Sequence, residues 1–327
     1  MLLARLSAVG FACLALACDR KVERPEPKAR ASATLSAAKP APAAALNEIT
    51  RLTTQPVSAY SASLAVDDDA VYLLTSKAAF RFARDEPPHG IALSLGTGPA
   101  LTRSAFVYWS SGAIWSTPKQ GGDTRRLATL AHQPQYFVAS GDEFAWIDLS
   151  DAGLFTIQTL EKGEPRVLLS SSGELSALNM VGDAIYFVER PSDDSFRIGV
   201  VPRRGGQPLY TGARKGRRPA MLSGSEQIYY YSLDGSELRE LSLDLKREEV
   251  TLRGLVCSPI QVSTAIYCGC VEGLFEVSRQ SHVPRILVHD RPGSITGIAS
   301  NAKRLAWLVD TGADQLAVDE LRLPEAR

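Results

Sequence analysis

Apolar and polar positions alternate along most of the chain, and short polar turns interrupt the alternation at regular distances. Alternation with a period of two is typical of β-strands that bury one face. Within this pattern an aromatic residue with apolar or small neighbours recurs at intervals of 36 to 43 residues. The recurring positions are Tyr72, Tyr108, Trp146, Tyr186, Tyr229, Tyr267 and Trp307. A regular period of this length indicates a repeat protein with seven units.

Each repeat divides into four short strands joined by polar turns. In the first repeat Leu64-Ala65-Val66 is the strand before the aromatic, and Asp67-Asp68-Asp69 is the turn. We expect this turn to be solvated rather than to bind calcium, which needs about six to eight oxygen ligands. Later repeats carry Gly-Gly pairs such as Gly121-Gly122, which suit the positive φ values of hairpin turns. The repeats are therefore predicted to be four-stranded antiparallel meanders.

Four-stranded units arranged in a ring are the blades of a β-propeller. The predicted fold class is all-β, a seven-bladed propeller, because rings of six or eight blades fit seven aromatic positions less well. The seventh repeat ends near Leu323 after only three strands, whereas residues 49–53 resemble an outer strand and precede the first repeat. We therefore predict that the N-terminal strand completes the last blade and closes the ring.

The first 17 residues are predicted to be an export signal. One cation, Arg5, precedes twelve uncharged and mostly apolar residues from Leu6 to Ala17. Twelve residues of helix span only ~18 Å, too short for the ~30 Å core of a bilayer. The run Leu14-Ala15-Leu16-Ala17-Cys18 resembles the lipobox of bacterial lipoproteins, and this resemblance implies a lipid on Cys18. A plain secretory signal is the alternative.

Residues 18–46 differ in composition from the rest of the chain. The stretch is rich in alanine and proline and contains no aromatic residue. It cannot bury enough apolar surface to offset the entropy of ordering, and its prolines interrupt a helix. We expect a disordered tether over residues 18–46 and a propeller domain over residues 47–327.

Several segments of the predicted propeller carry a family resemblance. The pattern from Ala65-Val66-Asp67 to Val71-Tyr72 and the segment Val107-Tyr108-Trp109-Ser110-Ser111 are two of them. Two further segments share a proline, a cation and a Gly-Gly pair, Thr117-Pro118-Lys119-Gln120-Gly121-Gly122 and Val201-Pro202-Arg203-Arg204-Gly205-Gly206. They resemble the repeats of exported bacterial TolB-like and YWTD-like β-propellers. The resemblance implies the fold and an exported protein, but no particular ligand.

Charge and composition exclude some classes of function. The chain has 36 basic and 36 acidic side chains, whereas a nucleic-acid-binding protein needs an excess of Lys and Arg. Only four histidines are present, which gives little material for a zinc or haem site. We predict no metal, no cofactor and no nucleic-acid partner. Because the first 46 residues are net basic, the predicted propeller is mildly acidic.

Three cysteines, Cys257, Cys268 and Cys270, belong to the sixth repeat. If residues 262–265 form the hairpin turn, antiparallel counting places Cys257 opposite Cys270, and Cys268 points to the same side. In an oxidising periplasm we expect a disulfide from Cys257 to Cys270, with Cys268 as the alternative partner. Three thiols without a nearby histidine do not favour a zinc site.

A charged face is the candidate binding surface. The connection between the fourth and fifth blades is strongly basic, and it shares a face of the ring with the turns between second and third strands, which carry acids. The candidate residues on this face are Asp148, Asp151, Arg214, Arg217, Arg218 and Asp234. They could pair across the face or recruit an anionic partner. A simple solvated surface is the alternative.

The sequence contains no recognised enzymatic signature. It lacks the Gly-x-Ser-x-Gly elbow, the His-Glu-x-x-His motif and a phosphate-binding glycine loop. The function predicted is a monomeric, membrane-anchored binding or scaffold propeller outside the cytoplasm, on the periplasmic side or the cell surface, with a protein or glycan partner. The alternative is a propeller hydrolase or lyase that uses Asp148, Asp234, Arg217 and Arg218.

Overall fold

The computed structural model describes residues 49–55, 62–75, 78–84, 86–93, 97–216, 219, 222, 224, 226–232, 237–253, 260–270, 273–289, 293–312 and 315–323. The chain divides into two units, residues 1–44 and 45–327, and all described residues belong to the second. The predicted signal and the whole predicted tether, residues 18–46 with Cys18, therefore lie outside the described residues.

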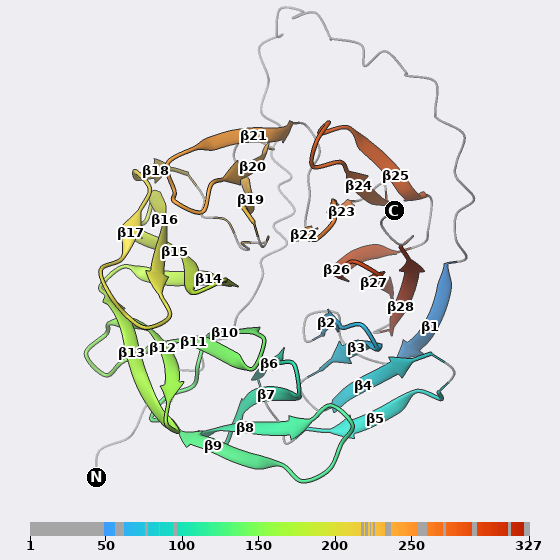
Figure 1. Cartoon of the computed structure of the whole chain (residues 1–327), viewed down its shortest axis with the longest axis horizontal. Coiled ribbons are helices and arrows are strands. Elements are labelled where there is room, and N and C mark those ends of the chain that lie inside the picture. Colours follow the sequence, from blue (N-terminus) through green and yellow to red (C-terminus); the bar gives the residue numbers. More distant parts are fainter. Residues whose placement is uncertain are drawn as a thin grey trace, which may run out of the picture. The chain divides into compact units, whose positions relative to one another are not determined.

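The second unit is a seven-bladed β-propeller, whose sheets follow one another in chain order around a ring (Figure 1). Neighbouring strands within each blade are antiparallel. The first three blades comprise β2 (Ser63–Val66), β3 (Ala70–Leu74), β4 (Ala78–Ala83) and β5 (His89–Ala92); β6 (Thr97–Leu101), β7 (Ala105–Ser110), β8 (Ala113–Pro118) and β9 (Arg125–Thr129); and β10 (Tyr136–Ser140), β11 (Glu143–Leu149), β12 (Phe155–Glu161) and β13 (Glu164–Ser171).

The remaining blades follow the same plan with local variations. Blade four has a short additional strand on its third strand, and three strands of blade five lie within the described residues. Blades four to six comprise β14 (Glu174–Val181), β15 (Ala184–Ser192), β16 (Ser195–Pro202), β17 (Leu209–Tyr210) and β18 (Arg214–Lys215); β19 (Ile228–Ser232), β20 (Glu237–Leu241) and β21 (Glu248–Arg253); and β22 (Ile260–Val262), β23 (Ile266–Cys270), β24 (Gly273–Val277) and β25 (Pro284–His289). Blade seven comprises β26 (Ser294–Ser300), β27 (Arg304–Gly312), β28 (Gln315–Arg322) and β1 (Thr50–Gln55).

The N-terminal strand closes the ring, as the sequence predicts. Strand β1 pairs antiparallel with β28 and becomes the outer strand of blade seven. The Arg51 guanidinium forms an ion pair with Asp319, a side chain with 0% exposure, and its Nη2 donates to Asp319 Oδ2 at 3.2 Å. In Figure 1 the blue β1 lies beside the dark red β28. Backbone pairing and a buried carboxylate therefore hold the two ends of the propeller together.

Burial changes with strand position in the blade. All five residues of β3, a second strand, are buried, whereas three of the five residues of β9, an outer strand, are exposed. The second strand is covered because neighbouring blades pack on both of its faces, and the outer strand faces solvent. All regular structure in the described ranges is β-strand or turn, and none of those residues belongs to a helix fit to cross a membrane.

The recurring aromatics occupy one position in each second strand, and all seven are buried. They join adjacent blades: Tyr72 of blade one meets Phe106 of blade two edge to face, with ring centroids 5.5 Å apart. Tyr230, next to the aromatic of blade five, packs in one cluster with Tyr186 of blade four. The aromatics therefore act in packing between blades, where large rings contribute most buried area.

The register of blade six differs by one residue from the predicted one. Val262 pairs with Ile266, and Ile260 pairs with Cys268. The chain reverses through residues 263–265, one residue more than the two-residue turn predicted. Within this turn the amide of Ser263 donates to the carbonyl of Ala265 at 3.0 Å. Counting from a two-residue hairpin therefore gave the wrong partner for each position of β23. Cys257 lies outside the described residues, so the pairing of the cysteines stays a prediction.

Candidate functional site

The antiparallel plan of a blade sends its turns to two opposite faces of the ring. Turns between first and second strands, and between third and fourth strands, share one face, which we call the first-turn face. Turns between second and third strands, together with the connections between blades, share the other, which we call the second-turn face. Of the predicted binding residues, Asp148, Asp151 and Arg214 are described, and they belong to the second-turn face.

Asp148 and Asp151 meet a histidine on the second-turn face. Asp148 is buried at the end of β11, and Asp151 is exposed in the turn that follows. His132 Nε2 is 2.9 Å from Asp151 Oδ1, and its Nδ1 is 3.7 Å from Asp148 Oδ1. The hydrogen bond with Asp151, assisted by the charge of Asp148, raises the pKa of His132. The two aspartates therefore form one local cluster within blade three.

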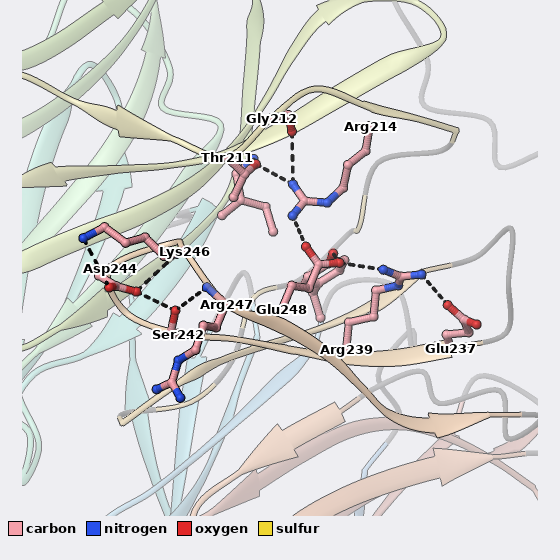
Figure 2. Close-up of polar contacts among 12 residues, drawn as sticks. Thr211, Gly212, Arg214, Glu237, Arg239, Ser242, Asp244, Lys246, Arg247 and Glu248 are labelled. Atoms are coloured by element: carbon pink, nitrogen blue, oxygen red, sulfur yellow. Dashed lines mark hydrogen bonds and ion pairs between the residues drawn. The ribbon is translucent and has the colours of Figure 1, made fainter.

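Arg214 belongs to a different network, at the outer edge of blades four and five (Figure 2). Its guanidinium bonds to Glu248 and Thr211, and to the carbonyl of Gly212 at 3.3 Å. Glu248 also accepts from the Tyr230 hydroxyl at 2.7 Å and from Arg239 Nη1 at 2.6 Å. Burial lowers the pKa of Arg214. The guanidinium thus ties β18 to β21 rather than facing a partner.

The structure therefore brings together two of the predicted binding residues, Asp148 and Asp151. Arg214 is engaged in a separate network, and Arg217, Arg218 and Asp234 lie outside the described residues. The predicted common cluster on the second-turn face stays a prediction.

The first-turn face carries interactions that the sequence analysis missed. Asp67, expected to be solvated, accepts the Lys119 ammonium of blade two at 2.6 Å and the Tyr72 hydroxyl at 3.0 Å on the same oxygen, Oδ2. Burial opposes ionisation of Asp67, but the bonds from Lys119 and from the amides of Ala70 and Asp69 hold its pKa below the usual value. The prediction of a solvated turn is thus wrong for Asp67, because a cation from the next blade covers it.

The same ion pair recurs in alternate blades. Arg203 of blade four reaches Glu143 of blade three at 2.6 Å, and Arg279 of blade six reaches Glu226, just before β19 of blade five, at 2.7 Å. In each pair the cation follows the third strand of its blade, and the acid precedes or begins the second strand of the preceding blade. For Lys119 and Arg203 the cation follows a proline that ends the strand. The Pro-cation-x-Gly-Gly segments thus place a cation at the junction between blades.

Backbone geometry explains the glycines of these segments. The amide of Gly205 donates to the carbonyl of Pro202 at 2.9 Å, and Gly205 has a φ of +79°. A Cβ at Gly205 would lie 3.1 Å from Arg166 Nη2, which comes from the outer strand of blade three. Glycine at this position therefore permits both the turn and the close approach of the neighbouring blade.

A cavity of about 290 Å³ opens on the first-turn face between blades three and four. The apolar part of its lining, which we call the floor, includes Phe144, Met180 and Ile185, all buried. Its rim carries charges of both signs. The charged lining residues are Asp142, Glu143, Glu161, Asp183, Arg166, Arg203 and Arg204. The volume lies at the lower limit of pockets that hold small ligands, roughly 300 Å³.

Most of the rim charges already have a partner. Arg203 pairs with Glu143 as described above, Arg166 Nη1 is 3.2 Å from Glu161, and Asp142 accepts from the Ser104 hydroxyl at 3.2 Å. Arg166 Nη2 also donates to the backbone carbonyl of Arg204. One donor, Arg203 Nε, is buried without a hydrogen-bond partner. The cavity therefore combines an apolar floor, fixed ion pairs and an unsatisfied donor.

Within the described ranges, no three His, Cys, Asp or Glu side chains are placed to ligate a metal ion.

Comparison with known proteins supports the fold. No family model and no curated protein matches this sequence. The β-propeller domain of Cps50 (Swd1) from Myceliophteria thermophila is similar with a TM-score of 0.63 and 10% identity, over 83% of this chain and 99% of that chain. The AfRom2 CNH domain is similar with a TM-score of 0.59 and 9% identity, over 85% and 100%.

A puromycin-hydrolyzing peptidase from Mycobacterium tuberculosis is also similar, with a TM-score of 0.59 and 11% identity. The match covers 80% of this chain but only 54% of that chain, so this chain spans about half of the peptidase. At these identities the likeness concerns the propeller architecture alone.

Proposed function

We propose that this chain is a lipid-anchored β-propeller on the extracytoplasmic side of a bacterial membrane, of the TolB-like or YWTD-like repeat type. In this role it binds a protein or glycan partner as a monomer and catalyses no reaction. One observation carries the proposal: the ring closes with the strand β1, which follows directly on the predicted tether. A lipid on Cys18 would hold a closed propeller near the membrane through that tether.

Binding rather than catalysis is favoured by the roles of the charged side chains. Arg214, Lys119 and Arg203 each form an ion pair that joins one blade to another or to its own connection. Such pairs fix the shape of a surface, as a scaffold requires. A propeller hydrolase or lyase would need free acids and bases that converge on a substrate.

Lipid attachment is tested by replacing the cysteine of the lipobox. In cells fed a radiolabelled fatty acid, Cys18→Ser should abolish labelling and release the chain into the aqueous phase of a detergent partition. Cys13→Ser is the matched control, because Cys13 lies in the same apolar segment. It should keep the label. Labelling of the Cys18→Ser chain, or a mature N-terminus without lipid, would contradict the proposed anchor.

The binding role is tested by cross-linking in the native membrane followed by mass spectrometry. We expect a recurrent protein or glycan adduct on the propeller that is lost when the chain is unfolded before cross-linking. Turnover of a screened substrate without any such adduct would favour the hydrolase or lyase instead.

We infer further that blade six carries a disulfide and that Cys268, rather than Cys270, pairs with Cys257. The observed register removes the counting argument for Cys270, and Cys268 is fully buried within β23. Peptide mapping of the exported chain without reduction should detect a Cys257–Cys268 cross-link. Cys270→Ser should keep it and Cys268→Ser should lose it. The reverse result would restore the pairing predicted from the sequence.

A further inference from the structure

Among the described residues that line the cavity between blades three and four, one cation and two anions have no partner of opposite charge. Glu143 and Glu161 pair with arginines, whereas Asp142 accepts only from the neutral Ser104 hydroxyl. Within the described residues, the guanidinium of Arg204 and the carboxylate of Asp183 form no hydrogen bond or ion pair, with each other or with another group. Both residues are exposed on the rim. The rim therefore presents one uncompensated cation, Arg204, and two uncompensated carboxylates, Asp183 and Asp142, to a ligand.

Arg204 gives the position of an anionic group. Arg203 is held by Glu143 through Nη1, and its Nε has almost no accessible surface, so the exposed Arg204 is the guanidinium left for a ligand carboxylate. Charge-assisted bonds of this kind are stronger than neutral ones.

The floor of the cavity suits an apolar side chain. Phe144, Met180 and Ile185 are buried beneath the charged rim. Met180 adds an adaptable surface, since its side chain is flexible and polarisable. A ligand therefore needs an apolar group between two opposite charges, and the volume of about 290 Å³ restricts it to a small molecule.

We propose that this cavity binds a short zwitterionic peptide, of about dipeptide size, with an apolar side chain. The ligand carboxylate lies against Arg204, the ligand ammonium lies near Asp183 and Asp142, and the apolar side chain contacts the floor. This goes beyond the proposed membrane scaffold, because it assigns a soluble small ligand to the first-turn face. It does not depend on lipid attachment or on a macromolecular partner.

The test uses the full mature chain in detergent micelles and four forms of one dipeptide, alanyl-leucine. These are the free zwitterion, the N-acetylated form, the C-amidated form and the form blocked at both ends. Calorimetric titration should give the tightest binding for the zwitterion. Each blocked end should weaken binding about tenfold, since each charge-assisted contact is lost.

Two variants assign the charges. Arg204→Gln introduces the residue that blade two carries at the same place, Gln120, and should make the zwitterion and the amidated form bind equally. Asp183→Asn combined with Asp142→Asn should make the zwitterion and the acetylated form bind equally. Arg126→Gln removes an exposed arginine of β9 that does not line the cavity, and it should change nothing.

Three results would overturn the proposal. One is the absence of binding by all four forms at about 10 mM, a concentration that detects even millimolar affinity. Another is equal binding of the four forms. A third is an Arg204→Gln variant that weakens all forms by the same factor. None of these results bears on the membrane scaffold, which the lipid-labelling and cross-linking experiments test separately.

Discussion

Two junctions between blades use the same loop and the same type of ion pair, yet they differ in what surrounds the pair. Between blades one and two, Lys119 is 8% exposed and shares Asp67 with the Tyr72 hydroxyl. Between blades three and four, Arg203 pairs with Glu143, which is 66% exposed, and a cavity lies beside the pair.

The aromatic residues at the two junctions also differ. Tyr72 extends its hydroxyl to the turn, so ring, carboxylate and ammonium form a continuous contact, with the ammonium 5.7 Å from the ring centroid. The corresponding Trp146 of blade three stacks on Phe144 at 5.9 Å, within its own blade. The comparison teaches that a repeated charge pair can be a buried structural contact at one junction and part of the rim of a cavity at another. Four substitutions or conditions would separate these roles.

Asp67→Ala should have the largest effect. It leaves the Lys119 ammonium buried without its counter-ion, a change that costs about 3 kcal/mol of unfolding free energy. Urea denaturation measures the loss. Asp69→Ala, in the same turn but without a contact from its carboxylate among the described residues, should cost much less. If both variants lose the same free energy of unfolding, the ion pair between Asp67 and Lys119 does not contribute to stability.

Acid should weaken the first junction next most strongly. Because the folded pKa of Asp67 lies below its value of 3.8 in the unfolded chain, the pair stabilises the fold above that value and loses this contribution as pH falls through the folded pKa. The effect should be smaller than that of Asp67→Ala, since a protonated carboxyl still accepts hydrogen bonds. Chemical denaturation at several pH values measures the free energy of unfolding of the wild type and of Asp67→Asn. The difference between the two free energies should become smaller as the pH falls from neutral to acid. A difference that does not change with pH would show that ionisation of Asp67 does not stabilise the fold.

Tyr72→Phe should cost about 1 kcal/mol, the net contribution of one hydrogen bond. The ring still packs against Phe106, and Asp67 keeps Lys119. Urea denaturation beside Tyr108→Phe, whose hydroxyl meets Thr117 at 3.2 Å, would compare a charged with a neutral acceptor. If Tyr108→Phe loses more free energy of unfolding than Tyr72→Phe, the bond to the charged acceptor is not the stronger of the two.

Glu143→Ala should have the smallest effect on stability, about 0.5 kcal/mol, because an exposed ion pair contributes little. It should also leave Arg203 free to turn toward the cavity. If the variant is destabilised as much as Asp67→Ala, the third junction is a structural contact like the first and the comparison fails.

The repeats can be predicted from the sequence because each one has the same local pattern of apolar, aromatic and turn residues. Alternating strands, one buried aromatic and a polar turn recur seven times, and the short C-terminal repeat requires β1 to complete it. The register of blade six could not be predicted as readily, since one extra turn residue shifts every pair of β22 and β23. Turn length depends on local backbone geometry rather than on hydrophobic pattern.

The contacts of the candidate sites were harder to predict for a different reason. Arg203 and Glu143 are 60 positions apart, and Arg214 meets Glu248 34 positions later. Such pairs depend on how one blade is rotated against the next, which a periodic pattern does not encode. A signal was nevertheless present, because the Pro-cation-x-Gly-Gly segment occurs in two alternate blades. The resemblance identified the segment, but only the structure shows that its cation reaches the preceding blade.

The closing strand has a consequence for the order of events in biosynthesis. Arg51 is synthesised among the first residues of the propeller, whereas its partner Asp319 follows 268 positions later. A chain made from its N-terminus folds its early units first, so β1 has to wait beside six completed blades before β28 exists. During that interval its hydrogen-bonding edge is open to other chains. The strand β28, the last of the propeller strands to be synthesised, therefore decides whether β1 finds its own partner or a foreign one.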